Sequence, residues 1–133
     1  MTTTKPEISG IGQVQLNARD LQRAIVFYRD VLGLRFLFEI PGAAFFDAGN
    51  LRLMLAVAER EEFDHPGSIL YYRVAELDSA FRAVRDAGAA IEHEPQLIAR
   101  MPDHELWMAF LRDPEGNLLG LMSEVRGMEG GTA

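Results

Sequence analysis

Three histidines are the side chains best suited to acid–base chemistry in this 133-residue sequence, which contains no cysteine. His104 precedes the only tryptophan, Trp107, in a loop segment that leads into an expected strand. Imidazole titrates near neutral pH, so His104 is a candidate for ligand contact or proton transfer, and a solvated loop histidine is the alternative. His93 lies between two glutamates, but strand alternation places it on the face opposite to both. His65 lies in a charged segment and is expected at the surface.

Tyr71 and Arg73 are two positions apart in an expected strand, and they share one face of it with Ile69. An arginine held on a strand can receive a carboxylate or a phosphate, and the tyrosine adds a ring and a hydroxyl group. The alternative is that Arg73 pairs with a nearby acidic side chain. Gln13 and Gln15 share the polar face of another expected strand, where an amide either contacts a ligand or is solvated.

Several other kinds of chemistry and partner are disfavoured. The sequence has no Gly-x-Ser-x-Gly motif, no phosphate-binding glycine loop and no HExxH pair. The net charge is −7, from 20 acidic and 13 basic residues, which disfavours a nucleic-acid partner. No apolar run approaches the ~20 residues that span a bilayer, and the first residues lack the apolar core of a signal peptide. We therefore expect one cytoplasmic domain without a membrane partner.

Short strands and two helices must position these side chains. The first helix is expected to be capped by Asp20 and ended by Gly33, and the second runs from Leu77 to Gly88. The patterns typical of strands occur at 12–17, 34–40, 43–47, 51–57, 69–74, 90–94, 97–99, 107–111 and 118–123.

This order repeats within the chain. A shift of 56 residues places Leu21 on Leu77, and a shift of 67 places Gly49-Asn50 on Gly116-Asn117. Two copies of one βαβββ unit explain both matches. We therefore divide the sequence into a flexible tail (1–9), module one (10–58), a linker (59–67), module two (68–125) and a second flexible tail (126–133).

Two stretches resemble the vicinal-oxygen-chelate superfamily, which includes glyoxalase I, bleomycin-resistance proteins and extradiol dioxygenases. Residues 20–34, with Phe27-Tyr28 and Leu32-Gly33, resemble its first helix. Residues 112–119, Arg-Asp-Pro-Glu-Gly-Asn-Leu-Leu, resemble its final hairpin. The resemblance implies an α+β fold in which two tandem βαβββ modules form curled mixed sheets around a cleft. It also implies a homodimer.

The resemblance further implies where a divalent metal would be held, by one residue from the first and last strand of each module. These positions fall on Gln13, Ile69, Gly120 and Leu53, with Met54 as the alternative to Leu53 if the register slips by one. Metals of this class are bound by His, Glu or similar donors, so one amide among apolar residues is not expected to hold one.

Two functions remain open, and neither assigns a catalytic residue. The first is a protein without a cofactor that binds a small organic molecule in an apolar cleft. Its expected lining is Gln13, Gln15, Leu53, Ile69, Tyr71, Arg73, His104, Trp107, Gly120 and Met122. The second is a lyase, isomerase or dioxygenase that holds Zn, Ni, Mn or Fe through Gln13, His104 and Glu124. In this second case Glu124 would lie about 13 Å from Gly120 along its strand.

Overall fold

The computed structural model describes residues 5–7, 9–61 and 64–126 of the chain. Module one contains β1 (Gln13–Asn17), α1 (Leu21–Val26), the π-helical turn η1 (Phe27–Val31), β2 (Arg35–Ile40), β3 (Ala43–Asp47) and β4 (Arg52–Ala56). Module two contains β5 (Leu70–Arg73), α2 (Leu77–Asp86), β6 (Ala90–Arg100), β7 (His104–Arg112) and β8 (Leu118–Arg126). The predicted tandem βαβββ fold is confirmed.

Each module forms a four-stranded mixed sheet, and the strand order is the same in both: β1-β4-β3-β2 and β5-β8-β7-β6. The first strand of each module pairs in parallel with the last, and the other neighbours are antiparallel. The turn before the last strand contains a glycine with positive φ in both modules, Gly49 at +87° and Gly116 at +88°. Glycine adopts this left-handed conformation without steric cost, which accounts for the repeated Gly-Asn pair.

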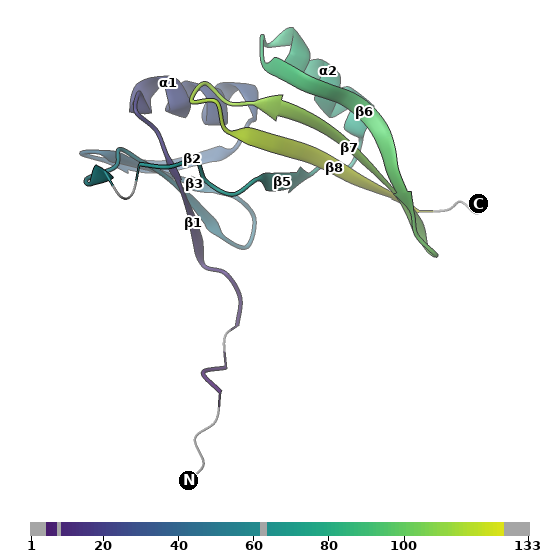
Figure 1. Cartoon of the computed structure of the whole chain (residues 1–133), viewed down its shortest axis with the longest axis horizontal. Coiled ribbons are helices and arrows are strands. Elements are labelled where there is room, and N and C mark those ends of the chain that lie inside the picture. Colours follow the sequence, from purple (N-terminus) through teal and green to yellow (C-terminus); the bar gives the residue numbers. More distant parts are fainter. Residues whose placement is uncertain (1–4, 8, 62–63, 127–133) are drawn as a thin grey trace.

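One helix covers one face of each sheet, and Figure 1 shows both helices on the same side of the molecule. α1 packs on β3 and β4, whereas α2 packs on β6, β7 and β8. The helix-facing side chains of both sheets join in one buried core, whose largest fully buried members include Tyr28, Phe46, Leu55 and Leu111. We call the opposite side of each sheet its open face.

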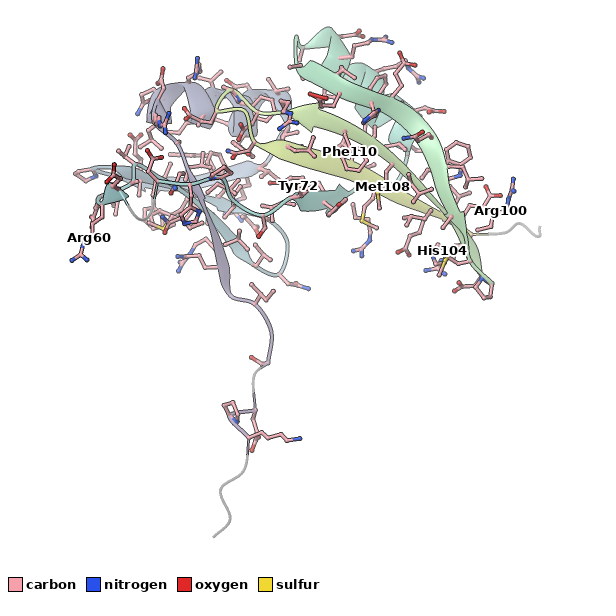
Figure 2. The ribbon with its side chains drawn as sticks, in the orientation of Figure 1. Arg60, Tyr72, Arg100, His104, Met108 and Phe110 are labelled. Atoms are coloured by element: carbon pink, nitrogen blue, oxygen red, sulfur yellow. The ribbon has the colours of Figure 1, made fainter. Side chains whose placement is uncertain are left out.

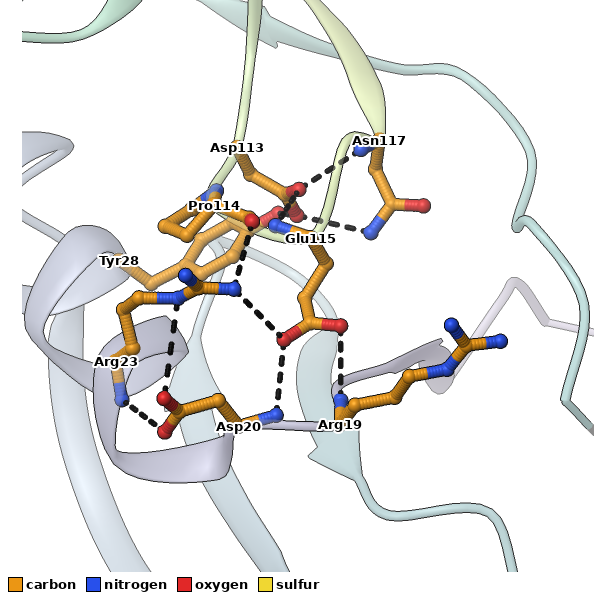
Figure 3. Close-up of polar contacts among 8 residues, drawn as sticks. All are labelled: Arg19, Asp20, Arg23, Tyr28, Asp113, Pro114, Glu115 and Asn117. Carbon is orange, nitrogen blue, oxygen red and sulfur yellow. Dashed lines mark hydrogen bonds and ion pairs between the residues drawn. The ribbon is translucent and has the colours of Figure 1, made fainter.

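The turn between β7 and β8 holds the start of α1, so module two is joined to module one (Figure 3). The carboxylate of Glu115 accepts hydrogen bonds of 2.9 Å from the backbone N–H groups of both Arg19 and Asp20. The Pro114 carbonyl accepts a 2.9 Å bond from the guanidinium group of Arg23. Asp20 caps the helix as predicted, because its side chain accepts the backbone N–H of Arg23 at 3.1 Å. A carboxylate at a helix N-terminus is favoured because the free N–H groups carry partial positive charge.

Three strands in module two are longer than the sequence predicted. The segments 90–94 and 97–99 form the single strand β6, which contains Pro95. β6 is an edge strand with several register shifts, so a residue without an N–H group is tolerated there. β7 begins at His104, which therefore lies in a strand and not in a loop. β8 extends to Arg126, the first residue of the predicted tail, and residues 127–133 lie outside the described part of the chain.

The predicted N-terminal tail is described only at residues 5–7 and 9, which form neither helix nor strand. The predicted linker, described at 59–61 and 64–67, contains short bends and one helical residue, Glu61. Within the described residues, no helix has the length and apolar character needed to cross a membrane.

Candidate functional site

A cavity of about 910 Å³ lies between the two modules. Module two contributes Tyr71, Arg73 and Met122, and module one contributes Leu53 and the turn 47–51. Four residues predicted to line a cleft are therefore brought together here. Leu53 belongs to the inner wall, because only 1% of it is exposed.

An aromatic cluster covers Gly120 on the open face of module two. The rings of Tyr71 and Phe110 meet edge to face with centroids 6.0 Å apart, and Phe110 meets the ring of His93 in the same way at 6.1 Å. A Cβ atom at Gly120 would lie 2.9 Å from Cδ2 of Tyr71 and 3.2 Å from Cε1 of Phe110. Gly120 pairs with both residues across the sheet, so any larger residue there would displace the rings.

Arg73 lies on the same open face, two residues beyond Tyr71 and opposite Met122. No hydrogen bond or ion pair joins the side chain of Arg73 to another residue within the described ranges. Glu124 lies further along the same face, but its carboxylate accepts a 3.0 Å bond from Nη2 of Arg126. The alternative expected from the sequence, a pair between Arg73 and a nearby acidic residue, is thus not found in the part of the chain that the structure describes.

A second cavity, of about 710 Å³, lies on the open face of module one. Gln15 and Asn17 line it together with Met54 and with His65 from the linker. The Asn17 amide donates a 3.2 Å hydrogen bond to the backbone carbonyl of His65, which holds the linker against β1. Gln15 is therefore separated from Tyr71 and Arg73, because the open faces of the two sheets carry different cavities.

Gln13 has the only amide among the positions where the resemblance implies metal ligands. Its Oε1 atom accepts a 2.9 Å hydrogen bond from Arg52, and its Nε2 atom lies 3.5 Å from the sulfur of Met54. Neighbours on its own sheet therefore use both ends of the amide. Gln13 does not line either of the two cavities.

The other implied ligand positions do not supply donors. Leu53 points into the core, and Met54 lies on the open face, as the alternative register predicted. A slip of one residue reverses the face of a strand side chain, which explains why the shift of 67 fails at this position. Ile69 precedes β5 and is 44% exposed, but it lines neither cavity. Gly120 is covered by Tyr71.

No three His, Asp or Glu side chains come together as metal ligands in the described ranges. Divalent metals of this class need several nitrogen, carboxylate or thiolate donors that converge on one point. The residues at the implied positions therefore do not fit such a metal.

His104 belongs to an ion-pair cluster at one end of the paired strands β7 and β8, the end farther from the turn that connects them. Figure 2 shows Phe110, Met108 and His104 following one another along β7. The Nδ1 atom of His104 lies 2.8 Å from the carboxylate of Asp103, and Arg126 pairs with both Asp103 and Glu124. The hydrogen bond with His104 lowers the pKa of Asp103, and the charge of Arg126 acts in the same direction. His104 and Glu124 are thus engaged by partners in module two, whereas Gln13 belongs to the other sheet.

Trp107 lies on the helix-facing side of β7 and packs against the main core, so the expectation that it lines the cleft is wrong. Its indole N–H donates a 3.1 Å hydrogen bond to Glu105. This bond, together with one from Arg100, lowers the pKa of Glu105. Alternation along β7 leaves the open face to Met108 and Phe110.

Phe110 and Met108 were not among the residues predicted to line the cleft, although the sequence contains a signal for both. In an antiparallel hairpin, residues at equal distances from the turn lie opposite each other and share a face. Arg112 pairs with Leu118, so the same count places Phe110 opposite Gly120 and Met108 opposite Met122.

Comparison with known proteins agrees with this architecture. Residues 10–121 match the family model described as "Glyoxalase/Bleomycin resistance protein/Dioxygenase superfamily". A lactoylglutathione lyase from Agrobacterium tumefaciens is 26% identical, with a TM-score of 0.69 over 90% of this chain and 96% of that one. TioX from Micromonospora sp. ML1 is 22% identical, with a TM-score of 0.71 over 88% and 100% of the two chains, which shows a shared fold. The integron cassette protein VCH_CASS1 of V. Cholerae is 23% identical, with a TM-score of 0.73 over 90% and 98%. A comparison with curated proteins found no significant match.

Proposed function

Because the chain belongs to the glyoxalase/bleomycin resistance protein/dioxygenase superfamily, we propose that it binds a small organic molecule without a divalent metal. The binding surface is the open face of module two, beside the cavity between the modules. The packing of Tyr71 and Phe110 over Gly120 carries this proposal. Gly120 occupies a position where the family resemblance implies a metal ligand, and in this chain the rings of Tyr71 and Phe110 cover it instead.

The composition of the site supports binding more than chemistry. Ligand sites are mostly apolar and contain a few polar groups that fix orientation. Here the apolar part comes from Tyr71, Phe110 and Met122, and the polar part from Arg73. Two of the three histidines lie away from this surface, because His104 is bonded to Asp103 and His65 lines the cavity on module one. His93 borders the surface, where its ring packs on Phe110.

Elemental analysis tests the metal-free part of this proposal. The protein is purified without chelators, and its metal content is measured again after incubation with Zn, Ni, Mn or Fe(II). We expect much less than one metal ion per chain in every condition. Nearly one metal per chain, lost in a Gln13→Ala or His104→Ala variant, would support the metal-dependent enzyme and overturn the proposal.

Ligand screening tests the binding part. Compounds that bind at the proposed surface should raise the melting temperature equally with and without a chelator, since binding of the folded state stabilises it by mass action. The shift should disappear in a Tyr71→Ala variant. A shift that survives this substitution would place the binding site elsewhere.

We further expect a homodimer, and apolar side chains on the open face of module one support this. Phe38 and Ile40 are 45% and 46% exposed there. Large apolar side chains gathered on one surface often mark an interface. Light scattering after size exclusion should give about twice the chain mass of 14.9 kDa. A monomer mass at every concentration would contradict the expectation.

A further inference from the structure

We propose that the open face of module two selects an aromatic carboxylate, whose ring lies against Tyr71 and Phe110 and whose acid group pairs with Arg73. This inference rests on the proposed function and adds the chemical class of the ligand. Two independent features carry it: an exposed aromatic surface, and an arginine that lacks a carboxylate partner beside it.

The aromatic surface is available to a ligand. Tyr71 is 47% exposed even though its ring packs on Phe110 and Gly120. Aromatic rings prefer offset or edge-to-face contacts, and the 81° angle between Tyr71 and Phe110 leaves the two rings facing different directions. A planar ligand can therefore lie on one ring and meet the edge of the other. Met108 and Met122, which pair with each other beside these rings, add adaptable apolar surface.

Arg73 differs from most other arginines of this acidic chain. Arg19, Arg29, Arg85, Arg100, Arg112 and Arg126 all form ion pairs with carboxylates. Arg73 has no such partner in the described ranges, yet it lines the cavity between the modules. A guanidinium group can bind a carboxylate through two parallel hydrogen bonds, so a ligand acid would complete a pair that the protein leaves open.

The spacing fits one molecule that uses both features. Tyr71 and Arg73 are two positions apart in β5, which corresponds to about 7 Å between their Cα atoms. The arginine side chain is long enough to reach an acid group one bond away from a ring that lies on Tyr71. Glu124, the carboxylate further along this face, is paired with Arg126, so its charge is compensated there.

The test uses three small probes on the full-length protein in chelator-containing buffer. 2-Naphthoate has the ring and the acid, 2-naphthalenemethanol has the ring alone, and cyclohexanecarboxylate has the acid alone. Affinities are measured by ligand-observed NMR or calorimetry. We expect 2-naphthoate to bind about tenfold more tightly than either other probe, as one added charge-assisted contact predicts. Equal affinities for 2-naphthoate and 2-naphthalenemethanol would overturn the inference.

Substitutions locate each half of the site. Arg73→Gln should reduce the preference for the acid to about twofold or less and leave binding of 2-naphthalenemethanol unchanged. The matched control is Arg82→Gln, since Arg82 is an exposed arginine of α2 whose side chain also lacks a partner in the described ranges. A preference for the acid that persists in Arg73→Gln, or that is lost in Arg82→Gln, would overturn the assignment of Arg73.

Gly120→Ala tests the aromatic half, because its Cβ atom must push the rings of Tyr71 and Phe110 apart. Both naphthalene probes should weaken together, while cyclohexanecarboxylate is unaffected. If this variant does not fold, Tyr71→Leu provides the same test at an exposed position. Unchanged binding of the naphthalene probes in Tyr71→Leu would overturn the placement of the ring.

Different results would contradict the preference for aromatic acids and the metal-free binding function. If 2-naphthalenemethanol and 2-naphthoate bind equally well in chelator, a metal-free binding protein remains and only the preference for acids is wrong. If binding of every probe requires an added metal, the proposed function is wrong as well.

Discussion

The hydroxyl group of Tyr28 donates a 2.8 Å hydrogen bond to Oδ2 of Asp113, which lies 85 residues later in the chain. Tyr28 belongs to the helical segment of module one and Asp113 to the turn that begins the last hairpin of module two. The second oxygen of the carboxylate accepts the backbone N–H groups of Glu115 and Asn117. One buried carboxylate therefore shapes the turn and joins the two modules.

Removal of the Asp113 carboxylate should lower the free energy of unfolding. Asp113→Ala leaves the Tyr28 hydroxyl group and two turn N–H groups without their acceptor, and we expect a loss of about 3 kcal/mol in the free energy of unfolding. Urea denaturation measures the loss. The matched control is Asp103→Ala, an exposed carboxylate whose removal should cost less than about 1 kcal/mol. Similar losses in both variants would show that the buried bond between the modules has no special role.

The Glu115 carboxylate should stabilise the folded protein through its position at the N-terminus of α1. Glu115→Gln keeps the size of the side chain but removes the charge that faces the N–H groups of Arg19 and Asp20, with a predicted loss of about 1 kcal/mol. Glu92→Gln is the control, because Glu92 forms an exposed pair with Arg112 and should change stability by less than about 0.5 kcal/mol. Equal effects in urea denaturation would argue against the capping role.

The same turn explains why the fold could be predicted from sequence. The Asp-Pro-Glu-Gly-Asn motif has a local cause, since Asp113 binds the turn and Gly116 requires positive φ. The two helices have an equally local pattern of apolar spacing and terminal glycines. Such features depend on neighbours in the chain, so the tandem βαβββ order, the Asp20 cap and the repeated Gly-Asn turn were all predicted.

The site was predicted less well because it depends on which face each strand presents. The repeat shift assigned Leu53 to the place of Gly120, but Leu53 faces the core and Gly120 the open face. Trp107 was assigned to the cleft by its proximity to His104, whereas the pairing of β7 with β8 turns it toward the helices. Gln15 and Arg73 were predicted to line one cleft, but they line different cavities. Their separation depends on how the two modules pack, and no local sequence pattern specifies that packing.

Gly116 should be more sensitive to substitution than a glycine that has the same open space but no positive φ. Its φ angle is +88° and nothing lies within 4 Å of an added Cβ atom, so Gly116→Ala acts only through backbone strain of about 1–2 kcal/mol. Gly12→Ala is the control, because Gly12 also has open space but no positive φ. We expect the control to be neutral or slightly stabilising. Equal melting temperatures of the two variants would contradict the prediction.

Two buried tyrosines should make the protein sensitive to alkaline pH. Burial, together with the nearby Tyr72 and Asp113, raises the pKa of Tyr28, and burial together with Asp113 raises the pKa of Tyr72. The Tyr72 hydroxyl group has no hydrogen-bond partner within the described part of the chain, so nothing offsets the desolvation of its ionised form.

The sign of the effect follows from the number of protons bound in each state. Above about pH 10 the tyrosines of the unfolded chain lose their protons, whereas Tyr28 and Tyr72 in the folded chain keep theirs. The unfolded state then binds fewer protons, so the free energy of unfolding falls as pH rises, by about 1.4 kcal/mol per pH unit for each tyrosine. Urea denaturation between pH 9 and 11.5 should show this slope. Tyr72→Phe should halve it, whereas Tyr71→Phe, which changes an exposed ring, should leave it unchanged. A slope that is the same in Tyr72→Phe and the parent protein would exclude Tyr72 as its source.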